Sequence, residues 1–142
     1  MTPMGRFPRV LAIDFGEART GLAATDWTGT VTLPLGRIEG LDDRSLARAI
    51  ARLVAERQAE RVVLGMPLLR DGSAGARARR TGEFLRILEQ ELACPISTID
   101  ESHTTDEAHE LLKQGGIKAA RRKLLADSTA ALVILRRYLE SL

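Results

Sequence analysis

The sequence predicts an α/β domain in which helices flank a mixed five-stranded sheet. Three short apolar runs follow one another before Glu39 and are joined by turns of hairpin length, which makes these strands antiparallel. Two later runs, Val62–Leu64 and Ile96–Ile99, each follow a helical pattern, and a buried strand after a helix is typical of a parallel crossover. With 142 residues, 44% of them hydrophobic, the chain is long enough for a single domain, 1–142, with a full core.

The antiparallel part is expected at the amino-terminal end, after a loose tail over residues 1–8. Its strands are predicted at Arg9–Phe15, Thr20–Thr25 and Thr30–Ile38, because apolar and β-branched residues alternate there with glycine-containing turns. Pro34 lacks a backbone N–H and therefore marks an edge position or a bulge in the third strand.

The remaining elements alternate between helices and strands. Asp42 or Asp43 is placed to cap a helix that runs to Gln58, because apolar residues recur there at helical spacing. Further elements are predicted as a strand at Arg61–Gly65, a helix at Ala76–Leu92, a strand at Pro95–Ile99, a helix from Thr104 or Thr105 to Gln114 and a last helix from Ala120 or Leu124 to Leu139. The connections put the first strand at the centre of the sheet beside the fourth, which is the ribonuclease H-like arrangement.

Three acidic residues stand out by their positions. Asp14 ends an apolar run, and ionised carboxylates are rarely buried unless they are paired or bind a metal; it either caps its own turn or is a ligand on a rigid strand. Asp100 and Glu101 follow a strand, and adjacent residues there point to opposite sides, so at most one faces Asp14. Asp127 lies near the start of the last helix among small apolar residues, either as a helix N-terminal charge or as a third ligand.

Convergence of Asp14, one acid of the Asp100–Glu101 pair and Asp127 would require a cation. Carboxylates that meet repel one another and raise their own pKa values unless a positive ion joins them. Ligands made only of oxygen suit Mg²⁺ or Mn²⁺. Strand ends of open α/β sheets are the usual place for such a site.

Basic residues form two local clusters although the net charge is only +2. One lies within residues 70–80 and the other within residues 113–123, and each is beside candidate acids. A single cluster reads as a solvated surface, but two of them favour a polyanionic partner. Aromatic residues make up only 4%, which disfavours a base-stacking platform. The members are Arg70, Arg77, Arg79 and Arg80 in the first cluster, and Lys113, Lys118, Arg121, Arg122 and Lys123 in the second.

Several function classes are disfavoured by composition. The one cysteine, Cys94, rules out an internal disulfide and fits a reducing cytoplasm. No apolar run reaches the length of a membrane span, and residues 1–9 lack the apolar core of a signal peptide. We therefore expect a cytoplasmic protein without a membrane partner.

Four groups of residues together carry a family resemblance that extends from about Arg9 to Leu139. They are Ala12–Gly16 with Arg19–Gly21, Gly65–Leu68 with Asp71-Gly72, Asp100-Glu101 with Thr104-Thr105, and Asp127 with Ala130-Ala131. In these groups the chain resembles the YqgF/RuvX family of Holliday-junction-resolvase-like and pre-16S ribosomal RNA nucleases. The resemblance implies a ribonuclease H-like fold and metal-dependent hydrolysis of phosphodiester bonds in structured nucleic acid. It makes Asp14, Glu101 and Asp127 the catalytic acids, holding one or two Mg²⁺ or Mn²⁺ ions.

The implied substrate is the 5′ end of precursor 16S ribosomal RNA, and a branched DNA junction is the alternative. The residues expected to contact nucleic acid are Arg19, which could also be an exposed turn residue, with Arg70, Lys118, Arg121, Arg122 and Lys123. One departure from the family is that Ser102 and His103 follow the Asp-Glu pair, where the family usually has arginine and leucine. A phosphate-facing cation is therefore expected to be missing there.

Two other classes of function remain open from the sequence. The first is a catalytically silent nucleic-acid-binding module, against which the three intact acids argue. The second is an ATP-handling protein of the actin and sugar-kinase type, since Asp14-x-Gly16 before a hairpin also begins that fold. Such proteins need a second phosphate loop and an adenosine pocket, for which 142 residues leave little room.

Overall fold

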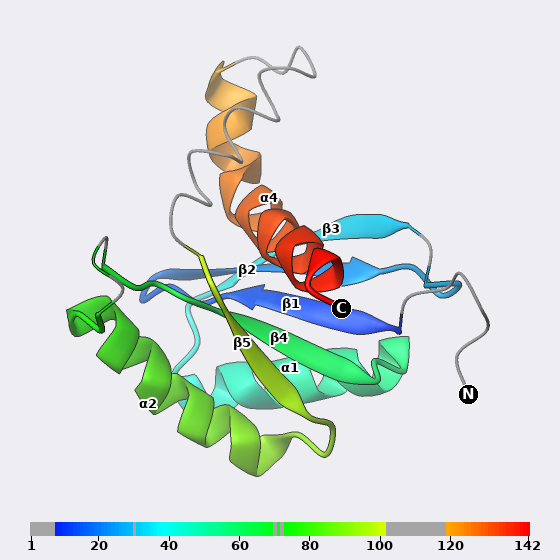
Figure 1. The fold of residues 1–142 in the computed structure, drawn as a ribbon, viewed down its shortest axis with the longest axis horizontal. Helices are drawn as coiled ribbons and strands as arrows, with labels where there is room; N and C mark the ends of the chain where they lie inside the picture. The colour runs from blue at the N-terminus through cyan, green and yellow to red at the C-terminus, as the bar shows by residue number, and fades with distance from the viewer. Residues whose placement is uncertain (1–7, 30, 70, 72, 102–118) are drawn as a thin grey trace.

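The computed structural model describes residues 8–29, 31–69, 71, 73–101 and 119–142, and the side chains of the last range from Ser128 onward. One five-stranded sheet, in the order β3-β2-β1-β4-β5, runs through the described part. Helices cover both of its faces (Figure 1). The elements in chain order are β1 (Val10–Asp14), β2 (Arg19–Thr25), β3 (Thr32–Glu39), α1 (Asp43–Arg57), β4 (Arg61–Met66), α2 (Ala76–Glu91), β5 (Ile96–Asp100) and α4 (Ala119–Glu140).

The sheet is mixed, as the sequence predicts. β2 pairs antiparallel with β1 and with β3, whereas β4 pairs parallel with β1 and with β5. The prediction that the first strand lies at the centre beside the fourth is therefore confirmed. Element ends differ from the expected ones by at most two residues, except that the last helix begins at Ala119, beside the expected start at Ala120 and well before the alternative start at Leu124. The helix expected up to Gln114 lies outside the described residues. Among the helices that the structure describes, none is long and apolar enough to cross a membrane.

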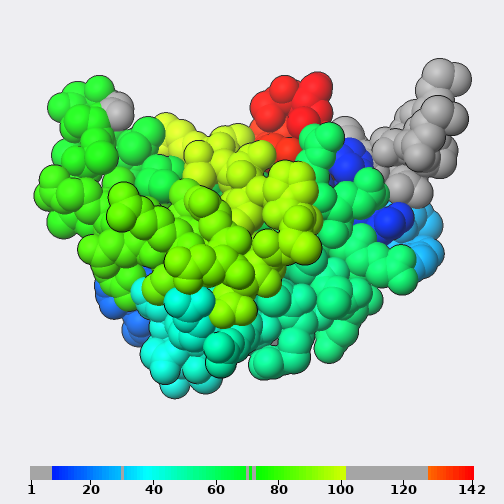
Figure 2. All heavy atoms as spheres, turned by 90° about the horizontal axis from the view of Figure 1, so that it is seen from below, coloured from blue at the N-terminus to red at the C-terminus, as the bar shows by residue number. Residues whose placement is uncertain are grey.

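The alternating residues of β1 face two separate hydrophobic cores. Leu11 and Ile13 pack toward α1 and α2, and Val10 and Ala12 pack toward α4, with all four at most 1% exposed. Figure 2 views the molecule from the side of α1 and α2, which lie against each other. Because helices cover both faces, the strand reads as a continuous apolar run rather than as an alternating one.

Local signals in the sequence fix where α1 begins and ends. The Asp42 carboxylate accepts a hydrogen bond from the backbone N–H of Ser45 at 2.8 Å, which confirms the predicted cap at this end and satisfies one of the free donors of the first turn. At the other end Gln58 adopts a left-handed conformation with φ of 51°, and its backbone N–H bonds the carbonyl of Ala55. The helix therefore stops there and the chain turns toward β4.

A bulge at the edge of the sheet anchors the helix that carries Asp127. The pairing register between β2 and β3 shifts between Leu22 and Ala23, opposite the segment Pro34–Gly36, as expected for proline on an edge strand. The Ser128 hydroxyl donates to the carbonyl of Leu22 and accepts from the N–H of Gly36, both at 2.9 Å. This buried side chain ties α4 to both strands and holds the backbone next to Asp127 against the sheet.

Candidate active site

Asp14 and Glu101 meet at the carboxyl end of the parallel strands. Asp14 is the last residue of β1, and Glu101 directly follows β5. The two strands flank β4, and the backbone N–H of Glu101 donates to the carbonyl of Met66 at the end of β4 at 3.1 Å. The carboxyl groups of Asp14 and Glu101 are hydrogen-bonded to each other. Two residues far apart in sequence therefore share one position at the sheet edge where ligands of such sheets gather.

The three acids at this edge have different exposures. Only 6% of Glu101 is exposed, Asp14 is partly buried, and Asp100 is exposed. This is the outcome expected from strand alternation, which turns only one residue of the Asp100–Glu101 pair toward Asp14. The backbone carbonyl of Asp100 accepts a hydrogen bond from the Arg137 guanidinium at 3.0 Å, which links the end of β5 to α4.

Burial and a neighbouring acid keep Glu101 protonated in the absence of a cation. Burial contributes most to the rise in the pKa of Glu101, and the hydrogen bond and the charge of Asp14 also raise it; the resulting pKa is about 9. The charge of Asp100 acts in the same direction, while that of Arg77 acts in the opposite direction. The Oε1 atom of Glu101 is buried and has no hydrogen-bond partner among the described residues. The pair therefore holds a shared proton and one unsatisfied oxygen. A cation could replace the proton and satisfy the oxygen.

A glycine in β4 makes room for the Glu101 side chain. A Cβ atom built on Gly65 would lie 3.0 Å from Oε2 of Glu101 and 2.5 Å from Cδ1 of Ile134 in α4. No side chain fits there without displacing one of them. Sequence reasoning placed Gly65 in a family motif but gave it no role. The available signal was a glycine inside a buried strand, which often marks a close approach of another group.

The remaining predicted site residues are described only in part. Asp127 lies on α4 one residue before Ser128, and its side chain is outside the description, as are those of Arg121, Arg122 and Lys123 on the same helix. Arg19 is exposed at the start of β2. The structure therefore brings Asp14 and Glu101 together. Residues outside the described ranges are Arg70, Ser102, His103 and Lys118.

Arg80 belongs to an ion network and not to an open basic surface. Its guanidinium makes two hydrogen bonds of 2.8 Å to the two oxygens of Asp43 and a further bond to Glu17. It also lies 5.1 Å from the centre of the Phe15 ring, which stacks on Phe84. The Asp43 and Glu17 carboxylates raise the pKa of Arg80 above its ordinary value. Grouping Arg80 with the neighbouring arginines as a polyanion-binding cluster is therefore wrong for this residue.

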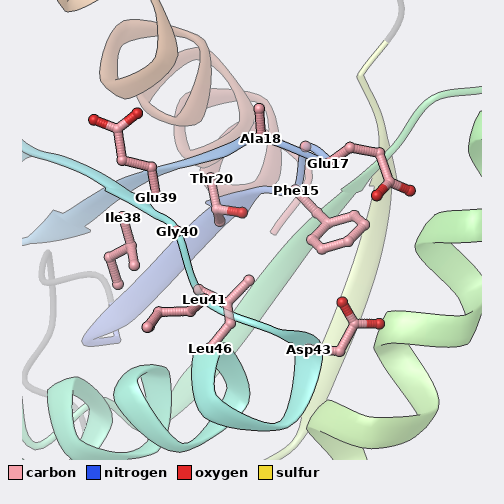
Figure 3. Close-up of a pocket in the computed structure, with 11 residues that line it drawn as sticks. Phe15, Glu17, Ala18, Thr20, Ile38, Glu39, Gly40, Leu41, Asp43 and Leu46 are labelled. Carbon is pink, nitrogen blue, oxygen red and sulfur yellow. The ribbon is translucent and has the colours of Figure 1, made fainter.

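The acids of this network come from different parts of the chain. Figure 3 shows Glu17 from the β1–β2 turn and Asp43 from the start of α1 beside the Phe15 ring, at one side of a small pocket. Arg80 adds α2 to the same contact. Three segments are therefore held together directly after Asp14, which fixes the backbone that leaves the acid pair.

Comparisons with known proteins agree with this architecture. The family model described as "RuvX: Holliday junction resolvase" matches residues 8–141. The chain is 36% identical to a protein of Chloroflexus aurantiacus named "Putative pre-16S rRNA nuclease", over 93% of this chain and 86% of that protein. It is 40% identical to a protein of the same name from Synechococcus sp. (strain JA-3-3Ab), over 92% of this chain and 82% of the other.

Two solved structures share the fold at low sequence identity. The fowlpox virus Holliday junction resolvase matches with a TM-score of 0.56 at 14% identity, covering 94% of this chain and 99% of the viral protein. Thermus thermophilus RuvC matches with a TM-score of 0.53 at 15% identity, covering 92% and 97% of the two chains. At these identities the likeness concerns the fold alone, and it confirms the predicted ribonuclease H-like arrangement.

Proposed function

The chain belongs to the RuvX family, and from this premise we propose that it is a metal-dependent nuclease that trims the 5′ end of precursor 16S ribosomal RNA. The contact between the carboxyl groups of Asp14 and Glu101 carries the proposal. The names of the relatives support the RNA substrate. A substrate of this kind also puts the protein in the cytoplasm.

The donor set fits a divalent cation. Two carboxyl groups are in contact, and the buried Oε1 of Glu101 lacks a hydrogen-bond partner among the described residues. A buried polar atom without a partner is costly, so a ligand that satisfies it is favoured. Within the described ranges no third acid, histidine or cysteine completes a cluster; Asp127 is the residue proposed to complete it. Oxygen donors of this charge suit Mg²⁺ or Mn²⁺.

The three acids would together hold the cation in the proposed reaction. When bound, one or two such ions would polarise the phosphoryl group and lower the pKa of a water molecule. Asp14 and Glu101 supply negative charge from the ends of rigid strands, so little reorganisation is needed as charge develops on the phosphate. Asp127, on the helix anchored by Ser128, would supply the third carboxylate. Burial of Glu101 strengthens each of these interactions by lowering the local dielectric constant.

Basic side chains would hold the backbone of the substrate. The residues proposed for this role are Arg19, Arg70, Lys118, Arg121, Arg122 and Lys123. Phosphate contacts of this kind add affinity without reading sequence, and they make binding depend on salt. Replacing Arg121, Arg122 and Lys123 together by alanine is the direct check, since both affinity and salt slope should fall.

Cleavage of two labelled substrates side by side tests the function. Precursor 16S RNA and a four-way DNA junction are each incubated with Mg²⁺, with Mn²⁺ and with EDTA. We expect metal-dependent cutting of the RNA by the wild type and almost none by Asp14→Asn. Preferred cutting of the junction would favour the second candidate function, a resolvase-like DNA endonuclease. This candidate is supported by the description of the family model as a Holliday junction resolvase. Binding of either substrate without cutting in any metal would identify a silent binding module instead.

A further inference from the structure

Two arginines on α2 border one groove, and only one of them is neutralised. The groove has a volume of about 310 Å³ and lies between the turn Phe15–Glu17 and the first turns of α2, where Arg77 and Arg80 line it. Arg80 is bound to Asp43 and Glu17. Arg77 is exposed and makes no hydrogen bond or ion pair with any residue in the described ranges. One turn of helix therefore separates a compensated cation from an uncompensated one.

The groove adjoins the acid pair. Its wall Phe15–Glu17 directly follows Asp14 in the chain. The Arg77 guanidinium lies close enough to the Glu101 carboxyl group to oppose the rise of its pKa. A phosphate at the mouth of this groove would thus have the Arg77 guanidinium on one side and the two acids that would hold a metal ion on the other.

Arg77 is the basic side chain of the groove that is open to an anion. Glu17, the acid in the groove wall, contacts Arg80, which also binds Asp43 and lies 3.7 Å from Glu83. Ala76 begins α2 without an acid in the first turn and without a side-chain cap at Gly75, so the positive end of the helix dipole adds to the same potential. Arg80 is therefore occupied by acids, whereas Arg77 makes no ion pair with an acid in the described ranges. A guanidinium that makes no ion pair with a described acid is well suited to two parallel hydrogen bonds with a phosphate.

From this arrangement we propose that Arg77 binds a backbone phosphate of the nucleic acid next to the phosphodiester that is cut. The inference rests on the proposed nuclease function and adds a binding residue to it. Arg77 would hold the strand in the groove between the β1–β2 turn and α2, so that the neighbouring phosphate faces Asp14 and Glu101. The groove would thereby set the direction in which the substrate strand enters the site.

The test compares Arg77→Gln with Arg86→Gln, a matched change at an exposed arginine of the same helix that does not line the groove. Binding of a fluorescein-labelled RNA that covers the 5′ end of precursor 16S RNA is measured in EDTA over a range of salt concentrations, and thermal unfolding confirms that both variants fold. We expect Arg77→Gln to weaken binding about tenfold, as for a lost hydrogen bond to a charged group. The slope of log affinity against log salt should fall by about 0.7–0.9. Arg86→Gln should change neither.

A second arm locates the contact. Single phosphates of the RNA are replaced in turn by neutral methylphosphonates, and the penalty of Arg77→Gln should vanish at a position adjacent to the cut. Equal affinity and slope for Arg77→Gln, Arg86→Gln and a wild type that cuts the RNA would overturn the inference while leaving the nuclease intact. A penalty that persists with every methylphosphonate would also overturn it. A wild type that neither binds nor cuts would remove the function and the inference together.

Discussion

The acid pair and the Arg80 network lie within a few residues of each other and differ in how their charges are satisfied. Arg80 meets Asp43 through two hydrogen bonds of 2.8 Å and meets Glu17 as well. Asp14 and Glu101 are two acids that share a proton, and Oε1 of Glu101 is buried without a described partner. Opposite charges with satisfied hydrogen bonds stabilise a fold, whereas two acids held together in a buried position cost free energy until a cation joins them.

This difference separates a structural role from a functional one. Both groups are charged and partly or fully buried, so charge and burial alone would not distinguish them. The distinguishing feature is the unsatisfied oxygen, because native structures leave few buried polar groups without a partner. Strained or unsatisfied groups that persist are found mainly at functional sites. Substitutions at the acid pair should therefore reduce activity, whereas substitutions around Arg80 should reduce stability.

The largest effect is expected for activity at the acids. Asp14→Asn, Glu101→Gln and Asp127→Asn each keep the shape of the side chain and remove one carboxyl group from the proposed cation site. Cutting of the preferred substrate should fall by a factor on the order of 10²–10³, as for loss of one electrostatic stabiliser of the transition state. The fold should persist because one fewer acid is then held close to the others. Asp100→Asn, at the exposed neighbour, is the control and should cut at nearly the wild-type rate.

Asp43→Ala is expected to act on stability. It leaves the partly buried Arg80 guanidinium without its bidentate partner. Loss of hydrogen bonds to a charged group should lower the free energy of unfolding by about 1.5–3 kcal/mol. Urea denaturation of Asp43→Ala beside Glu101→Gln gives the comparison, in which only the first variant should be destabilised. An unchanged midpoint for Asp43→Ala would show that the Arg80 network contributes little to the fold.

Gly65→Ala is expected to lower both stability and activity. The new methyl group would come within 3.0 Å of Oε2 of Glu101 and 2.5 Å of Cδ1 of Ile134. Overpacking of this kind costs about 1–3 kcal/mol of stability. Because Glu101 must also shift, the rate of cutting measured on folded protein should fall in addition. A Gly65→Ala variant that is destabilised but cuts at the full rate would mean that the position of Glu101 is not critical.

The pH dependence of stability should be reversed from that of an ordinary ion pair. The unfolded chain loses the Glu101 proton near the ordinary value of 4.5, while the folded, metal-free protein keeps it to about 9. Between these values the folded state binds more protons, so the free energy of unfolding falls as the pH rises. Urea titrations in EDTA between pH 5 and pH 9 should therefore show wild type losing stability relative to Glu101→Gln. Parallel curves for the two proteins would contradict the raised pKa.

Local sequence signals were sufficient for most of the fold. The cap at Asp42 and the proline on the edge strand depend on neighbouring residues, and the order of strands follows from connection lengths and handedness. The acid pair could not be obtained in this way, because no spacing relates Asp14 to Glu101. It was reached through the family resemblance, and the hydrogen bond between the two groups came from the structure.

The role of Arg80 shows why charge counts along the sequence can mislead. Arg77, Arg79 and Arg80 form a run of like residues, yet they lie in different surroundings. Asp43 and Glu17 are 37 and 63 residues from Arg80 in the chain, so their neutralising effect is a tertiary contact. The need for glycine at Gly65 is likewise set by Glu101, directly after β5, and Ile134 of α4, which only the folded chain brings together.

Binding of Mn²⁺ followed by electron paramagnetic resonance tests most directly whether Asp14 and Glu101 form a cation site. Wild type, Asp14→Asn, Glu101→Gln and the control Asp100→Asn are titrated near neutral pH, without substrate. We predict that wild type and Asp100→Asn bind the ion and release the proton shared by the pair, since metal and proton compete for the same oxygens. Asp14→Asn and Glu101→Gln should bind it at least roughly tenfold more weakly, as expected for the loss of a direct ligand. Equal Mn²⁺ affinity in all four proteins would contradict the account.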